Sequence, residues 1–251
     1  MQSTDVSAPL RRVAIVGGGR LGTALARALR RVGAVVIGPI GRGAPLDQFA
    51  PDDLVLLTVP DDAIADVAAA IPLGPVVGHC SGALTLDVLG EHEALSMHPL
   101  LSVTDDGAEF TGAACAIAGR TVRALQGATG IADALGMEAI AVPDEMRSLY
   151  HAAASVASNY LVTLEDAAEQ LAASTGIERR HLARLAQSAL GNWTRLGGPA
   201  ALTGPIARGD EATVERQRAA VERAAPELRF LWDAMADATR AVARRKTPGS
   251  R

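Results

Sequence analysis

The stretch AIVGGGRLGTALARALRRVGAVVIGPIGRG, residues 14–43, decides the fold of this chain. It opens with a short apolar run and continues, after consecutive glycines, into an amphipathic segment of helical period. Gly17, Gly19 and Gly22 have the spacing G-x-G-x-x-G between the predicted strand and the predicted helix. That order of elements is typical of a turn that binds the pyrophosphate of a dinucleotide. The alternative is a glycine-rich turn without a ligand.

The residues of this turn each have a physical reason to be there. Gly17 permits the tight turn, Gly19 lets the backbone approach a pyrophosphate, and Gly22 allows the helix to pack closely on the strand. Arg20 and Leu21 open the helix. Free N–H groups and the helix dipole favour phosphate there, and the Arg20 guanidinium adds positive charge. We therefore expect these residues to bind the cofactor.

The second half of the quoted stretch indicates which dinucleotide is bound. An NAD site carries Asp or Glu about twenty residues after the turn, where the carboxylate binds the ribose 2′-hydroxyl. Here the predicted second strand ends at Gly38, and no acidic residue follows before Asp47. Arg42 lies just beyond the strand, where a guanidinium can pair with a 2′-phosphate; the alternative is a solvated loop charge. The sequence favours NADP(H) over NAD(H).

Composition narrows the class of function. Of the 251 residues, 49% are apolar, 21% are charged and 3% are aromatic, with a formal net charge of −4. A nucleic-acid partner is not expected, because such surfaces are basic or offer aromatic rings for stacking. No apolar run reaches membrane-spanning length, and Cys80 and Cys115 lack the spacing of metal ligands. The sequence favours a cytoplasmic protein with neither a membrane nor a metal partner.

The pattern of apolar runs divides the chain into two predicted domains. Residues 1–142 alternate short apolar runs with amphipathic segments, which predicts a doubly wound parallel sheet of the Rossmann-like α/β class that binds NADP. Residues 143–251 carry helical periodicity alone, interrupted by a Gly/Pro-rich loop at 197–210. We expect this all-helical domain to bind substrate and to form a dimer. The strands are predicted at 12–17, 34–38, 53–61, 74–82, 94–99 and 114–119.

Candidate ligand contacts follow the predicted strands, because doubly wound sheets bind ligands at the carboxyl ends of their strands. Val59 and Pro60 end one strand and are expected to flank the ribose and nicotinamide of the cofactor. Ser81 and Gly82 follow the next strand and are candidates to hold a substrate oxygen, unless they only shape the turn. His98 precedes a proline that favours extended geometry. We expect it to face the substrate, with a structural histidine as the alternative.

A polar stripe marks the first helix of the second domain. His151, Ser155 and Asn159 recur at every fourth position and share one face, drifting by about 40° per step. A buried polar stripe requires a ligand, a wet cleft or a contact between helices or subunits. Imidazole exchanges protons near neutral pH, so His151 is the candidate proton donor, with Ser155 and Asn159 orienting the substrate oxygen. In the downstream loop, Arg208 is a candidate clamp for a substrate carboxylate, or a part of the loop without that role.

The combination of VGGGRLG, VPDDAI, HCSG, HPL, YHAAASVASNYLVTL and LTGPIARGD resembles a bacterial family that joins a Rossmann-like domain to a C-terminal helical domain of unknown function. That family is similar in plan to 6-phosphogluconate dehydrogenases, hydroxyisobutyrate dehydrogenases, ketopantoate reductases, pyrroline-5-carboxylate reductases and deazaflavin-dependent NADP reductases. The resemblance implies a reductase that uses NADPH. For some members it implies reduction of ketopantoate to pantoate, a step of pantothenate biosynthesis.

The chain departs from these enzymes at one position. The hydroxyacid dehydrogenases carry Lys-x-x-x-Asn on this helix, and Asn159 matches the asparagine, but Ser155 stands in place of the lysine. The only lysine in the chain is Lys246. His151 is therefore the proton donor we expect in a reductase of a small 2-oxo acid, first of all ketopantoate. The alternatives are an imine, pyrroline-5-carboxylate or deazaflavin reductase and a non-catalytic NADP(H) sensor. A homodimer through the helical domain is expected.

Overall fold

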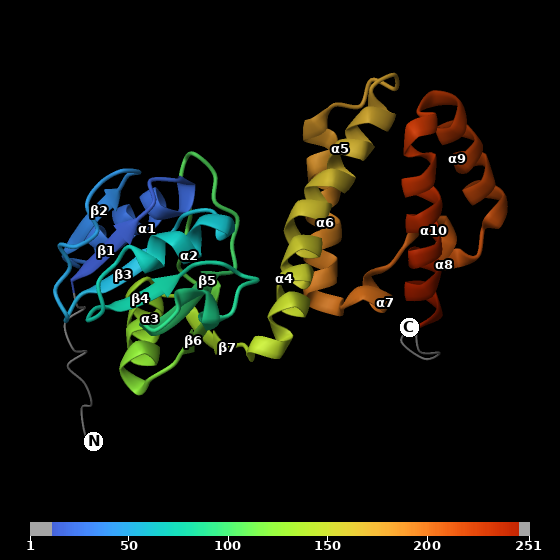
Figure 1. The fold of residues 1–251 in the computed structure, drawn as a ribbon. Coiled ribbons are helices and arrows are strands. Elements are labelled where there is room, and N and C mark those ends of the chain that lie inside the picture. Colours follow the sequence, from blue (N-terminus) through green and yellow to red (C-terminus); the bar gives the residue numbers. More distant parts are fainter. Residues whose placement is uncertain (1–11, 246–251) are drawn as a thin grey trace. The chain divides into compact units, whose positions relative to one another are not determined.

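The computed structural model describes residues 12–245 and divides into two compact units, Met1–Val156 and Ala157–Arg251 (Figure 1). The division falls later in the chain than the boundary after residue 142 that the sequence suggests. The reason is that the helix α4 (Arg147–Ser155) is held to the sheet by side-chain hydrogen bonds from its first two turns. Lys246 lies outside the described residues.

The first unit contains one seven-stranded sheet in the order β2-β1-β3-β4-β5-β6-β7. Its strands are β1 (Val13–Val16), β2 (Val36–Ile40), β3 (Leu54–Leu57), β4 (Val76–His79), β5 (Glu93–Pro99), β6 (Ala114–Gly119) and β7 (Glu138–Ala141). Neighbouring strands pair in parallel except β5 and β6. The Rossmann-like α/β class is confirmed.

Three features of the sheet differ from the prediction. β6 runs antiparallel to β5, because the connection between them contains no crossover helix to return the chain in the parallel direction. β7 was not predicted from the sequence, because the apolar run within it, Ala139–Ala141, is only three residues long and this edge strand is largely exposed. The second strand, β2, extends through Pro39 to Ile40 rather than ending at Gly38. A proline is tolerated there because β2 is an edge strand, where an N–H can be lost.

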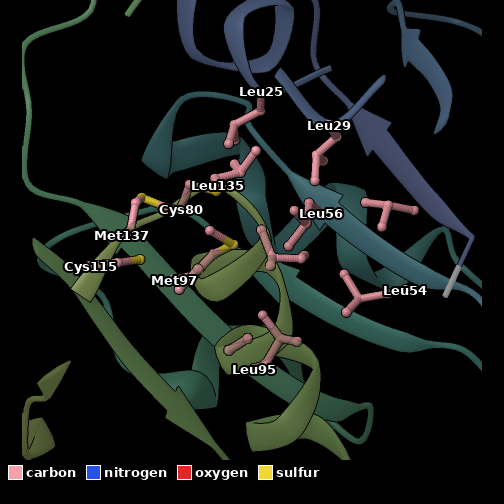
Figure 2. Packing of buried hydrophobic residues seen from close by; sticks show 14 of the residues in the cluster. Leu25, Leu29, Leu54, Leu56, Cys80, Leu95, Met97, Cys115, Leu135 and Met137 are labelled. Carbon is pink, nitrogen blue, oxygen red and sulfur yellow. The ribbon is translucent and has the colours of Figure 1, made fainter. Parts of the chain in front are cut away.

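The sheet is covered on both faces by helices that bury apolar side chains. They are α1 (Arg20–Arg31), α2 (Ile64–Ala69), α3 (Val122–Ala134) and the short 3-10 helix η2 (Leu86–Leu89). A second 3-10 helix, η1 (Asp61–Ala63), precedes α2 and has no buried residue. Figure 2 shows Leu25 and Leu29 of α1 lying over Leu56 of β3. The two cysteines belong to the same cluster, so Cys80 is a packed thiol and not an exposed nucleophile.

The strand order reverses direction at β1, which has β2 on one side and β3 on the other. Connections leave β1 and β3 toward opposite sides of the sheet at such a point, and this opens a crevice beyond the carboxyl ends of the strands. The glycine-rich turn that follows Val16 therefore lies where the fold provides space for a ligand.

The second unit is helical, as predicted. Its helices are α5 (Leu161–Ala172), α6 (Arg179–Leu196), α7 (Gly198–Ala201), α8 (Gly204–Arg208), α9 (Glu211–Ala224), η5 (Pro226–Leu228) and α10 (Arg229–Arg244). The Gly/Pro-rich segment is not the predicted loop. It forms α7 and α8, each with a proline in its first turn, where the missing N–H costs nothing.

Candidate active site

Close packing fixes two glycines of the turn after β1. Gly17 has φ 116°, and a Cβ added there would lie 2.7 Å from the carbonyl oxygen of Thr58. A Cβ on Gly22 would lie 2.1 Å from the Gly17 carbonyl oxygen and 2.4 Å from the Thr58 hydroxyl. That hydroxyl is within hydrogen-bonding distance of the Val16 and Gly17 carbonyls, at 3.1 and 2.9 Å. No other residue fits at Gly17 or Gly22 without moving β3.

Gly19, the second glycine of the motif, has free space around its Cα. A Cβ on Gly19 would meet no atom within 4 Å, and Gly19 caps α1 without a side-chain hydrogen bond. The first intrahelical bond runs from the Thr23 N–H to the Gly19 carbonyl, so the N–H groups of the preceding residues face outward. No acidic residue occupies the first turn of α1. This arrangement suits a phosphate that approaches the backbone from outside.

A cavity of about 320 Å³ opens beside the turn. It is lined by Val16, Gly17, Gly18, Gly19, Ile40, Gly41, Arg42, Gly43, Ala44, Leu46, Thr58, Val59, Pro60, Ala63 and Val67. The structure therefore brings Arg42, Val59 and Pro60 together with the glycine turn, although they come from three segments of the chain.

Arg42 is exposed and forms no hydrogen bond or ion pair with the residues that the structure describes. The N–H of Gly17 donates to the carbonyl of Ile40 at 2.9 Å, which sets the residues after β2 beside the turn. A Cβ on Gly41 would meet no atom within 4 Å, so an acidic side chain would fit at this strand end. Gly38 is not that position, because its Cβ would lie 2.5 Å from the carbonyl oxygen of Ile15.

Arg20 and Leu21 contribute differently from the glycines. The exposed Arg20 guanidinium donates to the Val103 carbonyl at 3.5 Å and lies 4.0 Å from Asp105. It lines a second, smaller cavity of about 190 Å³ that also contains Gly19. The Leu21 side chain packs against the apolar core, so only its backbone N–H can meet a ligand.

Imidazole side chains gather at the carboxyl ends of β4 and β5. His98 Nδ1 lies 2.7 Å from the Tyr150 hydroxyl, with the two rings edge to face. The ring of His151 lies 6.0 Å from that of His98, measured between centroids. A Cβ on Gly82 would lie 2.7 Å from His151 Cδ2 and 2.9 Å from His98 Nε2. Gly82 is therefore required as the spacer between the two imidazoles.

Ser81 lies in the same loop, but its hydroxyl is engaged within the protein. It donates to Asp61 Oδ2 at 2.7 Å and accepts from the N–H groups of Ala83 and Leu84. His79 is structural, since its ring nitrogens contact the Ser81 N–H and the Thr85 carbonyl. Both side chains shape the loop that carries Gly82.

Arg147 was not among the residues predicted for the site. Its side chain is 1% exposed and lies 3.3 Å from Asp144, with further bonds to the Ser81 carbonyl and the Ser96 hydroxyl. A lone arginine at the start of a helix usually belongs to the surface, and only the tertiary structure buries this one. It ties α4 to the Gly82 loop and to β5. Asp144 is the first residue of the short 3-10 helix η3 (Asp144–Met146), and its carboxylate pairs with Arg147.

Burial sets the protonation of this cluster. Burial, together with repulsion by neighbouring positive groups such as His151 and Arg147, lowers the pKa of His98 to about 4. Burial likewise lowers the pKa of His79 to about 4, and it raises that of Tyr150 to about 12. His98 and His79 are therefore neutral at pH 7, and Tyr150 keeps its hydroxyl proton.

The remaining predicted residues are distributed along the helices. Ser155 ends α4 half-buried and forms no side-chain hydrogen bond among the described residues. Asn159 is exposed in η4 (Val156–Tyr160), a π-helical turn between α4 and α5. In a π-turn four residues fall short of a full turn, so the predicted drift of the stripe does not apply, and such turns are frequent at functional sites. Arg208 is exposed at the end of α8.

No helix within 12–245 is both long and apolar enough to cross a membrane. Across the same residues, no three His, Cys, Asp or Glu side chains gather as metal ligands would.

Comparison with solved structures shows the same architecture elsewhere. Protein BF3122 from Bacteroides fragilis, assigned as an NADP oxidoreductase, matches with a TM-score of 0.79 and 18% identity, over 92% of this chain and 98% of its own. Protein TM1727 from Thermotoga maritima matches with a TM-score of 0.73 and 25% identity, over 92% of this chain and 98% of its own. The pyrroline carboxylate reductase of Plasmodium falciparum, with NADP bound, matches with a TM-score of 0.61 and 12% identity, over 93% of this chain and 99% of its own.

Sequence comparison gives the family. A search of curated proteins finds no match. The family model described as a domain of unknown function, DUF2520, matches residues 113–239, just over half of the 251 residues. It begins at β6 and extends into α10, and so spans parts of both units. This chain belongs to the DUF2520 family.

Proposed function

We propose that the protein is an NADPH-dependent reductase of a small 2-oxo acid, with ketopantoate as the first candidate substrate. The proposal rests on two groups of residues at the carboxyl edge of the same sheet. A dinucleotide turn and a free Arg42 follow β1 and β2, and a pair of imidazoles lies at the ends of β4 and β5. Such a reductase would serve pantothenate biosynthesis in the cytoplasm.

The turn fits NADP(H) for reasons found in the chain itself. Gly19 leaves the backbone open to a pyrophosphate, and the free N–H groups of α1 point to the same place. Arg42 has no acidic partner, and its planar guanidinium matches a 2′-phosphate with two hydrogen bonds. Val59 and Pro60 line the cavity on the side of β3. Arg20 adds charge at the mouth of the helix.

The reaction divides between cofactor and protein. When bound, NADPH supplies the hydride that adds to the carbonyl carbon. As the carbonyl π electrons move onto the oxygen, His151 as imidazolium gives that oxygen a proton and becomes neutral. Ser155 and Asn159 are proposed to orient the oxygen. His98 and Arg208 are proposed to hold the substrate, and Ser81 to do so only by shaping its loop.

The experiment is turnover of ketopantoate with NADPH by the wild type and by His151→Ala. We expect kcat to fall by about 10²–10⁴, the range of a lost general acid. His181→Ala is the matched control, because His181 is an exposed histidine of α6. Near-wild-type turnover by His151→Ala would refute the role of His151.

A second candidate is a reductase of a cyclic imine, which is favoured by the fold shared with the pyrroline carboxylate reductase. Assays of the same protein against ketopantoate, pyrroline-5-carboxylate and oxidised deazaflavin separate these substrates. A sensor is the third candidate, and it predicts tight NADP(H) binding, no turnover and no effect of His151→Ala.

We also propose a homodimer formed through the helical unit. The buried apolar residues of that unit are small: Ala167, Ala172, Val214, Val221, Ala225 and Ala236. Larger side chains such as Val162, Leu190 and Trp193 are at least half exposed. Apolar surface of this kind is typical of an interaction site. Sedimentation of a monomer at micromolar concentration would contradict the dimer, and Leu190→Glu should weaken it.

A further inference from the structure

The pairing of His98 with Tyr150 has no role in the function proposed above. Tyr150 stands on α4 and His98 on β5, and the hydroxyl lies 2.7 Å from Nδ1. The two rings meet edge to face at 5.6 Å between centroids, so both the hydrogen bond and the packing hold the imidazole in one orientation. The question is which of the two groups donates the proton.

The hydrogen bond between Tyr150 and His98 has one favoured direction. His98 is neutral, so one ring nitrogen carries a proton and the other carries a lone pair. If Nδ1 donated to Tyr150, both the phenolic proton and the Nε2 lone pair would lack a partner among the described residues. If the phenol donates to Nδ1, the phenolic proton has an acceptor and the Nε2 proton is left for a ligand or for solvent. Since Tyr150 keeps its proton at pH 7 and a phenolic proton without an acceptor costs free energy, the phenol is the donor.

The ring nitrogen of His98 that does not bond to Tyr150 is Nε2, and it lies next to Gly82. Nε2 of His98 faces the bare Cα of Gly82, where a Cβ would stand 2.9 Å away. His151 Cδ2 borders the same position from the other side. A proton on Nε2 therefore lies on the side of the ring toward His151, the proposed proton donor.

We propose that Tyr150 fixes His98 as an Nε2–H donor and that this selects a carbonyl oxygen over an iminium nitrogen as the acceptor group of the substrate. This inference rests on the proposed function. A carbonyl oxygen accepts a hydrogen bond and gains negative charge when hydride reaches its carbon, so the Nε2–H stabilises it. An iminium nitrogen carries its own proton and would need an acceptor at that place. Tyr150 is a positioning residue, and His98 is the group that contacts the substrate.

The first test is independent of turnover. Two-bond ¹⁵N–¹H correlation spectra of the labelled full chain at pH 7 distinguish the imidazole tautomers, and His98→Gln assigns the His98 signals. We expect a proton on Nε2 in the wild type and a shift toward mixed tautomers in Tyr150→Phe. Tyr160→Phe is the matched control, since Tyr160 is the other tyrosine of the chain and is exposed. A wild-type proton on Nδ1, or no change in Tyr150→Phe, would overturn the proposal.

The second test measures kcat and KM for ketopantoate and for pyrroline-5-carboxylate with NADPH. We expect the wild type to prefer ketopantoate, and Tyr150→Phe to lower kcat for it about tenfold or more with little change for the imine. His98→Gln, whose amide N–H can replace Nε2–H, should retain more activity than His98→Ala. Preference for the imine, or equal losses on both substrates, would overturn the selectivity. No turnover of either would refute the proposed function and leave the tautomer result standing.

Discussion

The glycine turn and the imidazole cluster lie at the same edge of one sheet but are built in opposite ways. The turn is made largely of backbone: residues 17–22 pack closely on Thr58, whose hydroxyl lies 2.9 Å from the Gly17 carbonyl oxygen. The cluster is made of the side chains of His98, Tyr150 and His151 around the bare Cα of Gly82, and these residues come from parts of the chain that are far apart in the sequence. Local spacing is therefore enough to find the turn, whereas the cluster exists only once β4, β5 and α4 are packed together.

Their electrostatics differ as well. Beside the turn, Arg42 is exposed without a partner among the described residues, α1 presents free N–H groups, and no acidic residue lines the cavity that contains Arg42. In the cluster, the buried Arg147 already has Asp144, Ser81 and Ser96 as partners, and His98 stays neutral beside it. The first region is suited to bind an anion, and the second to offer neutral hydrogen bonds.

The largest effect is expected from Gly22→Ala. Its Cβ would collide with the Gly17 carbonyl, which cannot move without breaking the turn, so we expect a loss of about 3 kcal/mol in unfolding free energy and of NADP(H) affinity. Gly19→Ala has open space and should lose affinity alone, while Gly18→Ala should stay closest to the wild type. Urea unfolding and titration calorimetry measure both quantities. Equal stability of the three variants would show that the close packing is not required.

Gly82→Ala tests the cluster in the same way. The new methyl group would push His98 and His151 apart, and a misplacement of about 1 Å costs on the order of 100-fold in rate. Stability should change little, because side chains rather than backbone give way. Gly130→Ala is the control, since that position in α3 is open. Unchanged kcat would mean that the imidazoles take no part in the reaction.

Arg42→Ala should weaken NADPH binding by about 10–100-fold, the loss expected when a hydrogen-bonded charge pair of about 1.5–3 kcal/mol is removed. Binding of NADH should hardly change, because it has no 2′-phosphate. Dissociation constants for the two cofactors, measured by fluorescence titration, give the ratio. An equal loss for both would refute the 2′-phosphate contact.

The smallest effect is a dependence of stability on pH. The pKa of His79 and of His98 is about 4 in the folded chain and about 6.5 when unfolded, so below pH 6.5 the unfolded chain binds more protons. Stability should fall between pH 6.5 and 4, and these two groups should cause little further loss below pH 4. Urea unfolding at pH 7 and at pH 5 measures this loss of unfolding free energy. His98→Gln should reduce the slope and His181→Gln should not; an unchanged slope in His98→Gln would contradict the assignment.

Prediction from sequence succeeded where the signal is local. G-x-G-x-x-G between a strand and a helix predicted the turn, and buried strands such as Leu54–Leu57 were evident as apolar runs. It failed where contacting residues are far apart in the sequence or where the local pattern of apolar residues is weak. The exposed edge strand Glu138–Ala141 has an apolar run of only three residues, and the prolines in the first turns of α7 and α8 look like loop residues when the sequence is read alone.

The sequence by itself determined the fold class, the glycine turn and the absence of an acidic residue after the second strand, because these depend on backbone geometry and on residues close in the chain. Only the tertiary structure decided that His98 pairs with Tyr150, that Gly82 separates two imidazoles, and that Arg147 is buried. The physical reason is that each of these facts depends on side chains brought together by the order of the strands. The sequence does not encode that order in any single stretch.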